Sequence, residues 1–397
     1  MNEDRKMADE TSDRAAEPNG EAEAEASAEA EADAGAEAGE GAEERAESGS
    51  GVAAVGGDEV ESGEVGEVSE AEGGEVEGGE AEGVAARVVP PGYRSGYVAL
   101  VGRPNAGKST LLNKLVGEKI AAVSNKPQTT RHQIQGVISR PGGQIVLVDT
   151  PGVHQPGYLL NRRMMAAVHD ALEGVDLVCL IRDASVSTGN GDRFVLDLVR
   201  RSEKPAILLL NKSDKIDDKR ALLPLIEWYN GEHEWRAVVP LSARTGDQFE
   251  PLVSEMIRAL PEGEPIFDED ELTDQPVRAI AAELVREKIL HVTGEEIPYV
   301  TAVVTELYEQ PSPDLARIYC AIYVERPSQK RIVIGKGGDR LKEIGTRARL
   351  DIEQLLGHRV YLELFVKVEE DWRNSPRALN EMGIEEGRGE RGRRGKG

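Results

Sequence analysis

The sequence predicts an α/β protein in which a doubly wound sheet is followed by a small α+β domain and preceded by a disordered acidic extension. Three observations support this prediction. The composition of the 397 residues changes near residue 90, apolar runs alternate with helical stretches from residue 96 to about residue 260, and a different order of elements follows residue 275. A chain of this length has room for two or three domains.

The first ninety residues differ from the rest in charge and in aromatic content. They contain 28 Asp and Glu against 5 Lys and Arg, and no Phe, Tyr or Trp, so they carry −23 of the net charge of −25. Such a segment has too little apolar surface to offset the entropy lost on ordering. We therefore expect residues 1–92 to be disordered, and interpret them as a solvating tail. The alternative is an acidic tail that competes with RNA for basic patches on the same chain.

Membrane-spanning, secreted and disulfide-rich classes are excluded. No run approaches the ~18–20 apolar residues of a membrane span. Residues 1–10 carry charges of both signs and have no apolar centre, unlike a secretory signal. Cys179 and Cys320 lie inside separate apolar, strand-like runs. A reducing compartment fits two such cysteines better than a disulfide framework does.

Residues 93–262 read as strands alternating with helices, which is typical of a parallel, doubly wound sheet. The expected strands are Tyr97–Val101, Gln144–Val148, Val175–Ile181, Pro205–Leu210 and Ala237–Leu241. The expected helices are Ser109–Gly117, Arg193–Arg201, Lys219–Tyr229 and Phe249–Leu260.

Residues 276–373 form the expected second domain, with the order α-β-β-α-α-β. Its segments are a helix at Pro276–His291, strands at Tyr299–Tyr308 and Leu315–Glu325, a helix at Gln329–Ile334, a glycine turn, a helix to about Leu356 and a strand at Val360–Glu370. Residues 263–275 are expected to be a linker, because the stretch Ala259–Thr273 is rich in Pro, Glu and Asp. Residues 374–397 are expected to be a flexible basic tail.

A phosphate-binding motif lies between the first strand and the first helix, the context that supports it. The residues that fit G-x-x-x-x-G-K-[ST] are Gly102, Arg103, Pro104, Asn105, Ala106, Gly107, Lys108 and Ser109. Glycines let successive backbone N–H groups face one anion at a helix N-terminus. Lys108 is then expected to reach the β- and γ-phosphates, and Ser109 to ligate Mg²⁺.

A second motif follows the next expected strand. It comprises Asp149, Thr150, Pro151 and Gly152. An Asp at the end of a strand beside the phosphate loop suits a Mg²⁺ ligand, and the Gly152 N–H suits a γ-phosphate. The next residue, Val153, is expected beside the nucleotide. Its apolar side chain cannot orient water as the Gln at this place in Ras-like enzymes does.

Two further motifs favour GTP over ATP. Asn211, Lys212, Ser213 and Asp214 follow one strand, and Ser242 and Ala243 follow another. A carboxylate at Asp214 can accept from both N1–H and N2–H₂ of guanine, which adenine does not offer. Asn211 and the stem of Lys212 can brace the ring, and backbone N–H groups at residues 242–243 can meet the guanine O6.

Together with Gln128-Thr-Thr-Arg-His132, these motifs occur in the order found in the translation-factor-related GTPases, which the sequence resembles. Residues 102–109 with Lys126-Pro-Gln-Thr-Thr-Arg-His132 are similar to the Era-like branch. The resemblance implies that Thr130 is the switch threonine, closing on Mg²⁺ when the γ-phosphate is present; Thr129 is the alternative.

The second domain carries a candidate RNA-binding loop, Gly335-Lys336-Gly337-Gly338, between two helical stretches. Glycines around a basic residue, in front of a helix, let a nucleic-acid backbone lie against the protein backbone. In the order α-β-β-α-α-β this matches the G-x-x-G loop of a type II KH domain. Lys330, Arg331 and Arg340 are expected to add phosphate contacts.

The resemblance to Era-like GTPases covers about residues 93–384 and implies further properties. It implies GTP hydrolysis to GDP in which Lys108, Thr130, Asn105 and Gly152 act on the phosphates. It implies Mg²⁺ held by Ser109, Thr130 and Asp149, with K⁺ held beside the phosphates by Asn105. It also implies binding to 16S ribosomal RNA in small (30S) subunit assembly, a monomeric cytoplasmic protein and peripheral contact with the cell membrane.

Two alternatives remain open at this point. One is a non-ribosomal regulatory GTPase of the same superfamily. The other is an RNA-binding assembly module in which GTP acts only as a clamp.

Overall fold

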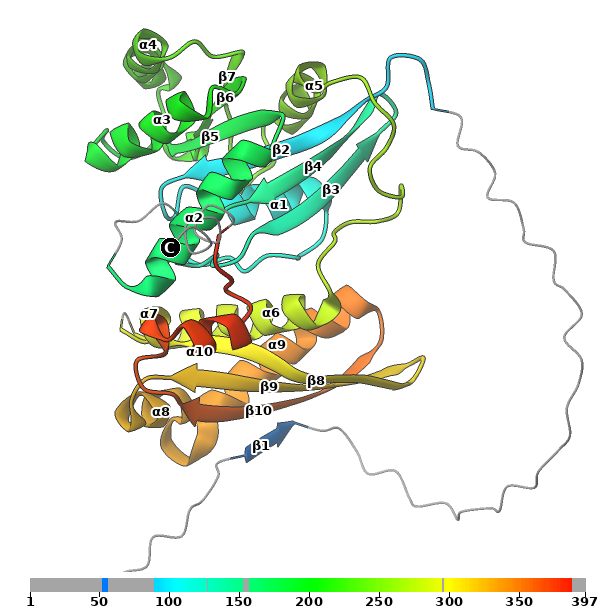
Figure 1. The fold of residues 1–397 in the computed structure, drawn as a ribbon, viewed down its shortest axis with the longest axis vertical. Coiled ribbons are helices and arrows are strands. Elements are labelled where there is room, and N and C mark those ends of the chain that lie inside the picture. Colours follow the sequence, from blue (N-terminus) through cyan, green and yellow to red (C-terminus); the bar gives the residue numbers. More distant parts are fainter. Residues whose placement is uncertain (1–51, 56–88, 127, 153–156, 295, 388–397) are drawn as a thin grey trace, which may run out of the picture. The chain divides into compact units, whose positions relative to one another are not determined.

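The computed structural model describes residues 52–55, 89–126, 128–152, 157–294 and 296–387. Most of the acidic extension, Val153 and residues 388–397 lie outside these ranges. The described chain forms a six-stranded and a four-stranded sheet, each covered by helices (Figure 1). None of its described helices is long and apolar enough to cross a membrane.

The six-stranded sheet has the order β3-β4-β2-β5-β6-β7. Its strands are β2 (Arg94–Gly102), β3 (Ile134–Arg140), β4 (Gly143–Asp149), β5 (Leu177–Asp183), β6 (Ala206–Asn211) and β7 (Ala237–Pro240). All neighbours are parallel except β3 and β4. The doubly wound architecture is confirmed, but the sheet is not wholly parallel, because the edge strand β3 returns through a tight turn. The sequence reading did not include β3.

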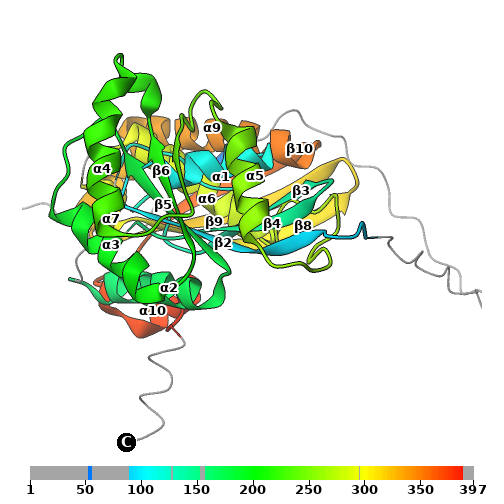
Figure 2. The ribbon, with the colours of Figure 1, turned by 90° about the horizontal axis from the view of Figure 1, so that it is seen from above.

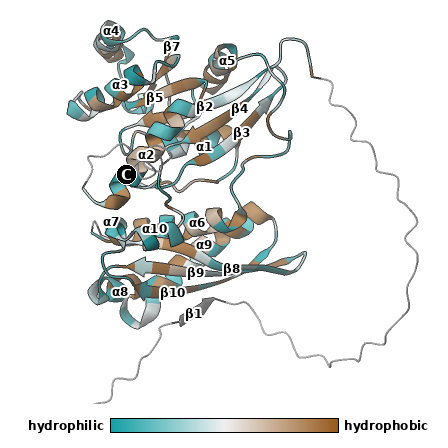
Figure 3. Cartoon of the chain, in the orientation of Figure 1, coloured by the Kyte–Doolittle hydropathy of each residue, from teal (hydrophilic) through white to brown (hydrophobic). Residues whose placement is uncertain are grey.

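Helices cover both faces of this sheet. They are α1 (Lys108–Val116), α2 (Leu159–Gly174), α3 (Asn190–Ser202), α4 (Leu223–Glu232) and α5 (Phe249–Ala259). In β2, Val98 and Leu100 belong to the core under α1 and α5, and Ala99 and Val101 to the core under α2 and α3. Figure 2 shows α1 and α2 on opposite sides of β2. Burial on both faces explains the continuous apolar runs of the central strands, brown in Figure 3.

The second sheet has the order β1-β10-β9-β8. The elements of this part are α6 (Val277–Val292), α7 (Ile297–Val300), β8 (Ala302–Ser312), β9 (Leu315–Val324), α8 (Pro327–Ile334), α9 (Asp339–Leu356) and β10 (Arg359–Val368). The order α-β-β-α-α-β is confirmed, with α7 as an addition. Tyr299, expected at the start of a strand, lies in α7. Cys179 in β5 and Cys320 in β9 are buried free thiols, and burial raises the pKa of Cys320 to about 11.

One short segment of the acidic extension pairs with the second sheet. β1 (Val52–Val55) pairs antiparallel with Leu362–Phe365 of β10. The physical reason is the unpaired backbone along the outer side of β10, which can accept one more strand. Val-Ala-Ala-Val is also one of the few uncharged stretches in the extension.

We expect removal of residues 1–90 to change the melting temperature by no more than a few degrees. A four-residue edge strand contributes little, and the surrounding acidic segment has little apolar area to pack. Thermal denaturation of the full-length and truncated chains tests this expectation. A large loss of thermal stability would show that the extension is part of the folded core. If instead the extension competes with RNA, the same truncation raises RNA affinity.

The segment after residue 373 also differs from expectation. It contains the helix α10 (Pro376–Glu381), and Leu379 and Ile384 are buried against Leu160 and Met164 of α2. Arg163 of α2, itself buried, donates to the Ile384 carbonyl oxygen at 2.5 Å. Residues 374–387 are therefore packed, because apolar side chains are interspersed among the basic ones. Only residues 388–397 could match the expected tail, and they lie outside the described residues.

The linker between the two domains is attached to the first sheet. The side-chain oxygen of Gln144 in β4 accepts the backbone N–H groups of Ile266 and Phe267 at 2.7 and 2.9 Å. The N–H of Val137 in β3 donates to the Leu272 carbonyl at 2.8 Å. These bonds fix the path of the linker between the sheet and α6.

Candidate functional site

The predicted phosphate loop joins β2 to α1, and its last glycine has no room for a side chain. Gly107 has φ +105°, in the left-handed region that favours glycine. A Cβ at this residue would lie 2.2 Å from Nδ2 of Asn211. That same nitrogen donates to the Ala106 carbonyl at 2.7 Å, which ties the phosphate loop to the end of β6. The sequence pattern and the backbone therefore agree on an anion-binding loop.

Lys108 is a buried cation inside this loop. Its Nζ donates to the carbonyl oxygens of Gly102 and Arg103 at 3.3 and 3.4 Å. Burial lowers the pKa of Lys108, and the charge of Asp149 acts in the opposite direction. A phosphate placed in the loop would add negative charge beside the ammonium group and favour its protonated form.

Three oxygen-bearing side chains meet at the first turn of α1. Ser109 Oγ donates to Asp149 Oδ2 at 2.7 Å and lies 2.8 Å from Thr130 Oγ1, which donates to the same carboxylate oxygen at 3.2 Å. Asp149 is fully buried, and its other oxygen, Oδ1, has no hydrogen-bond partner among the described residues. Burial raises the pKa of Asp149, whereas Lys108 lowers it.

A Mg²⁺ ion fits this cluster. It prefers oxygen ligands and is usually bound by one or two protein side chains together with phosphates and water. The unpartnered Asp149 Oδ1 is a buried acceptor that such an ion, or water bound to it, would satisfy. The described residues contain no group of three or more His, Cys, Asp or Glu side chains able to hold a metal, so hydroxyls are needed to complete any such site here.

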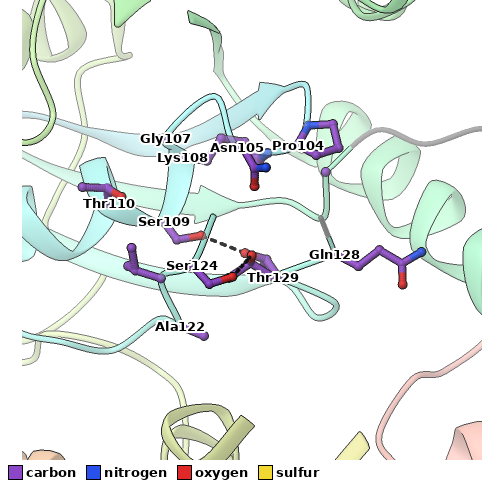
Figure 4. A pocket seen from close by; sticks show the side chains of 13 residues that line it. Pro104, Asn105, Gly107, Lys108, Ser109, Thr110, Ala122, Ser124, Gln128 and Thr129 are labelled. Atoms are coloured by element: carbon purple, nitrogen blue, oxygen red, sulfur yellow. Dashed lines mark hydrogen bonds between the residues drawn. The ribbon is translucent and has the colours of Figure 1, made fainter. Parts of the chain in front are cut away.

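The geometry favours Thr130 over Thr129 as the switch threonine. Thr129 Oγ1 donates to the Lys126 carbonyl at 2.6 Å and lies 2.9 Å from Ser124 Oγ, so it holds the loop's own turn. Figure 4 shows Ser124 and Thr129 together on the loop that faces Ser109 and Lys108. Of the two threonines, it is Thr130 whose hydroxyl contacts both Ser109 and Asp149.

The motif after β4 lies against the phosphate loop. A Cβ on Gly152 would be 3.2 Å from Cα of Pro104, so the two backbones approach closely. Thr150 Oγ1 donates to the Leu100 carbonyl at 2.7 Å and fixes the strand end; Pro151 is buried beside it. Val153, which follows Gly152, lies outside the described residues.

The side chain of Arg103 makes a contact that the loop motif does not specify. Its guanidinium group pairs with Asp192 of α3 at 2.9 Å. The backbone of Arg103 stays in the loop and remains a candidate contact for a nucleotide. The pattern G-x-x-x-x-G-K-[ST] leaves this position free, so it contained no signal about where the side chain goes.

The predicted guanine site is assembled from the ends of β6 and β7. The Ala243 N–H donates to Asn211 Oδ1 at 2.9 Å, and Ser242 Oγ donates to Asp214 Oδ1 at 2.7 Å. The hydrogen bond from Ser242 is the largest of the effects that hold the pKa of Asp214 below its usual value. Ser213, which is buried, donates its N–H to the Leu241 carbonyl and fixes the spacing of the two strand ends.

Two residues missed by the sequence reading complete this site. Asp183, at the end of β5, pairs with Lys212 Nζ at 2.6 Å, and the same ammonium group donates to the Asn105 carbonyl at 2.7 Å. Arg244 pairs with Asp214 Oδ2 at 2.7 Å and is largely exposed, so it can move away when a base enters. An Asp at the end of an apolar strand was the only signal for Asp183.

The candidate RNA loop lies between α8 and α9. Gly335 has φ +77°, and a Cβ there would be 2.8 Å from Cβ of Arg340. Gly337 and Gly338 are also left-handed, with φ +64° and +86°. Lys336 and Gly337 are exposed. The loop thus presents backbone and one lysine at the N-terminus of the long helix α9.

The basic residues around this loop fall into two groups. Arg331 and Lys336 are exposed, Lys330 is half-buried, and none of the three makes a salt bridge within the described ranges. Arg340 donates instead to the carbonyl of Ile332 and braces the end of α8. The first group is available to phosphates; Arg340 supports the loop's shape.

Comparisons with known proteins agree with both sites. A family model described as a 50S ribosome-binding GTPase matches residues 97–212, and a KH domain model matches residues 296–373. A GTPase Era from Alkaliphilus metalliredigens is 45% identical over 294 residues, which is 74% of this chain and 99% of that protein. A GTPase Era from Trichlorobacter lovleyi is 46% identical over 293 residues, 74% of this chain and 98% of that protein.

Two crystal structures are similar over the same extent, each with a TM-score of 0.71, 41% identity and coverage of 74% of this chain and 99% of the other. One is Era in complex with MgGDPNP and nucleotides 1506–1542 of 16S ribosomal RNA. The other is a single-residue variant of Aquifex aeolicus Era bound to GDP·AlF4⁻.

Proposed function

The chain belongs to the Era family of GTPases and hydrolyses GTP, and we propose that it couples this hydrolysis to binding of the 3′ end of 16S ribosomal RNA during 30S subunit assembly. The observation that carries the proposal is the presence, in one chain, of the Ser109–Thr130–Asp149 oxygen cluster and the Gly335–Gly338 loop. It is supported by a relative, 41% identical, that binds nucleotides 1506–1542 of this RNA.

We assign the nucleotide site as follows. The backbone of residues 102–109 holds the β-phosphate, and Lys108 bridges the β- and γ-phosphates. Ser109, Thr130 and Asp149 hold Mg²⁺, which when bound offsets negative charge on the phosphates. The N–H of Gly152 donates to the γ-phosphate, and Asp214 with residues 211–213 and 242–243 selects guanine.

Hydrolysis on these groups depends on positioning and electrostatics, because phosphoryl transfer needs little covalent help from protein. Lys108 is buried, so a phosphate beside it would supply the negative charge that favours its protonated form. Thr130 lies beside Ser109 in this structure, so its hydroxyl would link the bound nucleotide to the position of the loop that carries it. The N–H of Gly152, beside Pro104, would likewise link the γ-phosphate to the segment after β4.

Single-turnover GTP hydrolysis and RNA affinity test the proposal together. We expect hydrolysis that is faster with small ribosomal subunits, and tighter binding to an oligonucleotide of the 16S 3′ end than to a scrambled one. A regulatory GTPase unrelated to ribosomes would show no preference for that oligonucleotide. An RNA-binding module merely clamped by GTP would bind it without turnover when subunits are present.

Asn105 is our candidate ligand for K⁺ beside the phosphates. Its Nδ2 donates to the Asn125 carbonyl at 2.7 Å, which leaves the amide oxygen as the atom able to meet a cation. Hydrolysis should be faster in K⁺ than in Na⁺ by on the order of tenfold, less than the roughly 10²–10³ lost with an oxyanion-hole donor. Asn105→Ala should remove the difference with a modest loss of GTP binding.

The control for this prediction is Asn105→Asp. Asn105 has φ +61°, which Asp tolerates, and Asp retains a side-chain oxygen but loses the donor to the Asn125 carbonyl, so its rate should fall in both salts. The variant should keep the preference for K⁺. If Asn105 only braces the loop, Asn105→Ala lowers the rate equally in both salts. Equal rates of the parent protein in Na⁺ and K⁺ at matched ionic strength would refute the assignment.

The remaining parts of the proposal rest on family resemblance. We propose a monomer that works in the cytoplasm and makes peripheral contact with the cell membrane. Analytical ultracentrifugation tests the oligomeric state. Co-sedimentation with vesicles of anionic phospholipid tests the membrane contact, and no sedimentation above that with neutral vesicles would exclude it.

A further inference from the structure

The switch loop (residues 128–132) is held by contacts from both domains. Within its own domain, Gln128 Nε2 donates to Asn161 Oδ1 at 3.1 Å, Thr129 binds its own turn, and Thr130 contacts Ser109 and Asp149. Gln128 has φ +59°, a left-handed conformation that non-glycine residues adopt uncommonly. Its carbonyl oxygen is held from α6.

Arg286 of α6 supplies the central contact. Its guanidinium group is almost fully buried and donates to the carbonyl oxygens of Gln128, at 3.3 Å, and Thr129. Glu283, one turn earlier, pairs with the same guanidinium at 2.5 Å. A buried charge is costly unless it is paired and hydrogen-bonded. The two carbonyls are therefore required partners of Arg286, and they are the two that immediately precede Thr130.

A second arginine fixes the other side of Thr130. Arg131 is buried, and its guanidinium group donates to the carbonyl oxygens of Thr301 at 2.7 Å and Pro298 at 2.8 Å. It also lies 5.4 Å from the centre of the Trp372 ring. Thr130 is thus flanked by two buried arginine contacts that join the switch loop to the second domain.

Helix α6 also contacts the segment that precedes the switch loop in the sequence. Glu287, which is buried, accepts the backbone N–H of Val123 at 2.8 Å through one carboxylate oxygen. Its other oxygen pairs with Lys119 at 2.6 Å and Lys288 at 2.9 Å. Adjacent residues of α6, 286 and 287, therefore hold two points on the segment that runs from α1 to Thr130.

We propose that Arg286 is a positioning residue for GTP hydrolysis: from the second domain it holds the carbonyls of Gln128 and Thr129 so that the Thr130 hydroxyl stays beside Ser109 and Asp149. This inference rests on the proposed role of Thr130. Its consequence is that release of α6 from the switch loop withdraws Thr130 from the site. The docked second domain is thereby part of the hydrolytic machinery.

The test measures steady-state GTP hydrolysis and GDP affinity of full-length variants. Arg286→Ala combined with Glu283→Gln removes the guanidinium group without leaving a buried carboxylate unpaired. We expect kcat to fall by about tenfold to 10²-fold, the scale of loss when a reacting group is misplaced. KM for GTP should change less than kcat. GDP affinity should remain within about threefold, because GDP has no γ-phosphate for the closed loop to meet.

Two further variants separate positioning from general damage. Arg286→Lys keeps one buried donor and should recover part of kcat. Arg278→Ala, at an exposed arginine on the same helix, should match the parent. Thermal melts identify any variant that fails to fold, and Arg286→Lys then carries the comparison.

The outcomes distinguish this inference from the proposed function. A parent protein without GTP turnover, alone or with small subunits, contradicts the proposed function itself. A parent that turns over GTP while the folded Arg286 variants keep kcat within about twofold contradicts the positioning role alone. Equal losses in kcat and GDP affinity would also overturn it, since they indicate damage to the whole nucleotide site.

Discussion

Asp214→Asn should lower GTP affinity by on the order of 10²-fold or more and admit xanthine nucleotides. Each hydrogen bond to a charged group contributes about 1.5–3 kcal/mol, and guanine makes two such bonds to one carboxylate. The Asn amide offers one oxygen acceptor and places an NH₂ group against the guanine N2–H₂. Xanthine has a carbonyl oxygen at that position, so the same NH₂ group can donate to it.

The surroundings of Asp214 keep its side chain in the ionised carboxylate form that guanine binding requires. The hydrogen bond from Ser242 lowers its pKa, so the carboxylate stays ionised throughout the neutral range. Because the pKa of Asp214 is lowered, guanine selectivity is fully present above the usual Asp pKa and is lost only as the pH falls through the lowered value.

Nucleotide titrations with GTP, XTP and ATP measure the effect. Asp218→Asn is a matched control, because Asp218 is exposed, lies outside the guanine motif and contacts Arg220 and the adjoining backbone. It should leave all three affinities unchanged. A parent protein that binds ATP as well as GTP would contradict the guanine site, as would an Asp214→Asn variant that keeps its preference for GTP over XTP.

Lys336→Asp combined with Gly337→Asp should abolish most RNA binding while GTP hydrolysis without RNA survives. The pair changes the charge of the loop from positive to negative where phosphates are expected to lie. Gly337 has φ +64°, a conformation that Asp tolerates better than most residues, so the loop should still fold. We expect RNA affinity at low salt to fall by about 10²-fold or more, and the salt dependence to weaken by about one phosphate contact.

The other end of α9 provides a control of equal charge and backbone geometry. Gly357 has φ +71°, and Arg359 is exposed two residues later. Gly357→Asp with Arg359→Asp introduces the same change of charge as the loop variant. If RNA is bound at Gly335–Gly338, this control loses much less affinity in a filter-binding assay. Similar losses in the two double variants would indicate attraction by overall charge in place of a built site.

The elements most visible in the sequence are those whose local pattern and tertiary role coincide. Within β2, residues Tyr97–Val101 form an uninterrupted apolar run because both faces of the strand are buried. The phosphate loop is visible because Gly107 is required by a close contact and Lys108–Ser109 by chemistry. Asp149, at the end of β4, is found by the same logic, and the structure brings it within hydrogen-bond distance of Ser109.

The elements that escaped the sequence reading depend on distant partners. α2 contains Asn, two arginines, His and Asp among its apolar residues, and part of its apolar surface meets α10, far along the chain. β3 is an edge strand beside a loop, with a glycine near its start. Arg286 looks like any arginine on an amphipathic helix. Its role depends on its contact with the switch loop, and no local sequence pattern in α6 indicates that contact.

We propose that this chain uses its GTPase and KH domains together on 16S ribosomal RNA, and RNA crosslinking in the protein's own cells is the decisive experiment. Crosslinked RNA from the parent protein should concentrate at the 3′ end of 16S ribosomal RNA, in particles of the assembling 30S subunit. The Lys336→Asp, Gly337→Asp variant, expressed at the same level, should lose these crosslinks. Crosslinks spread over messenger and transfer RNA without enrichment at the 16S 3′ end, in parent and variant alike, would contradict the claim.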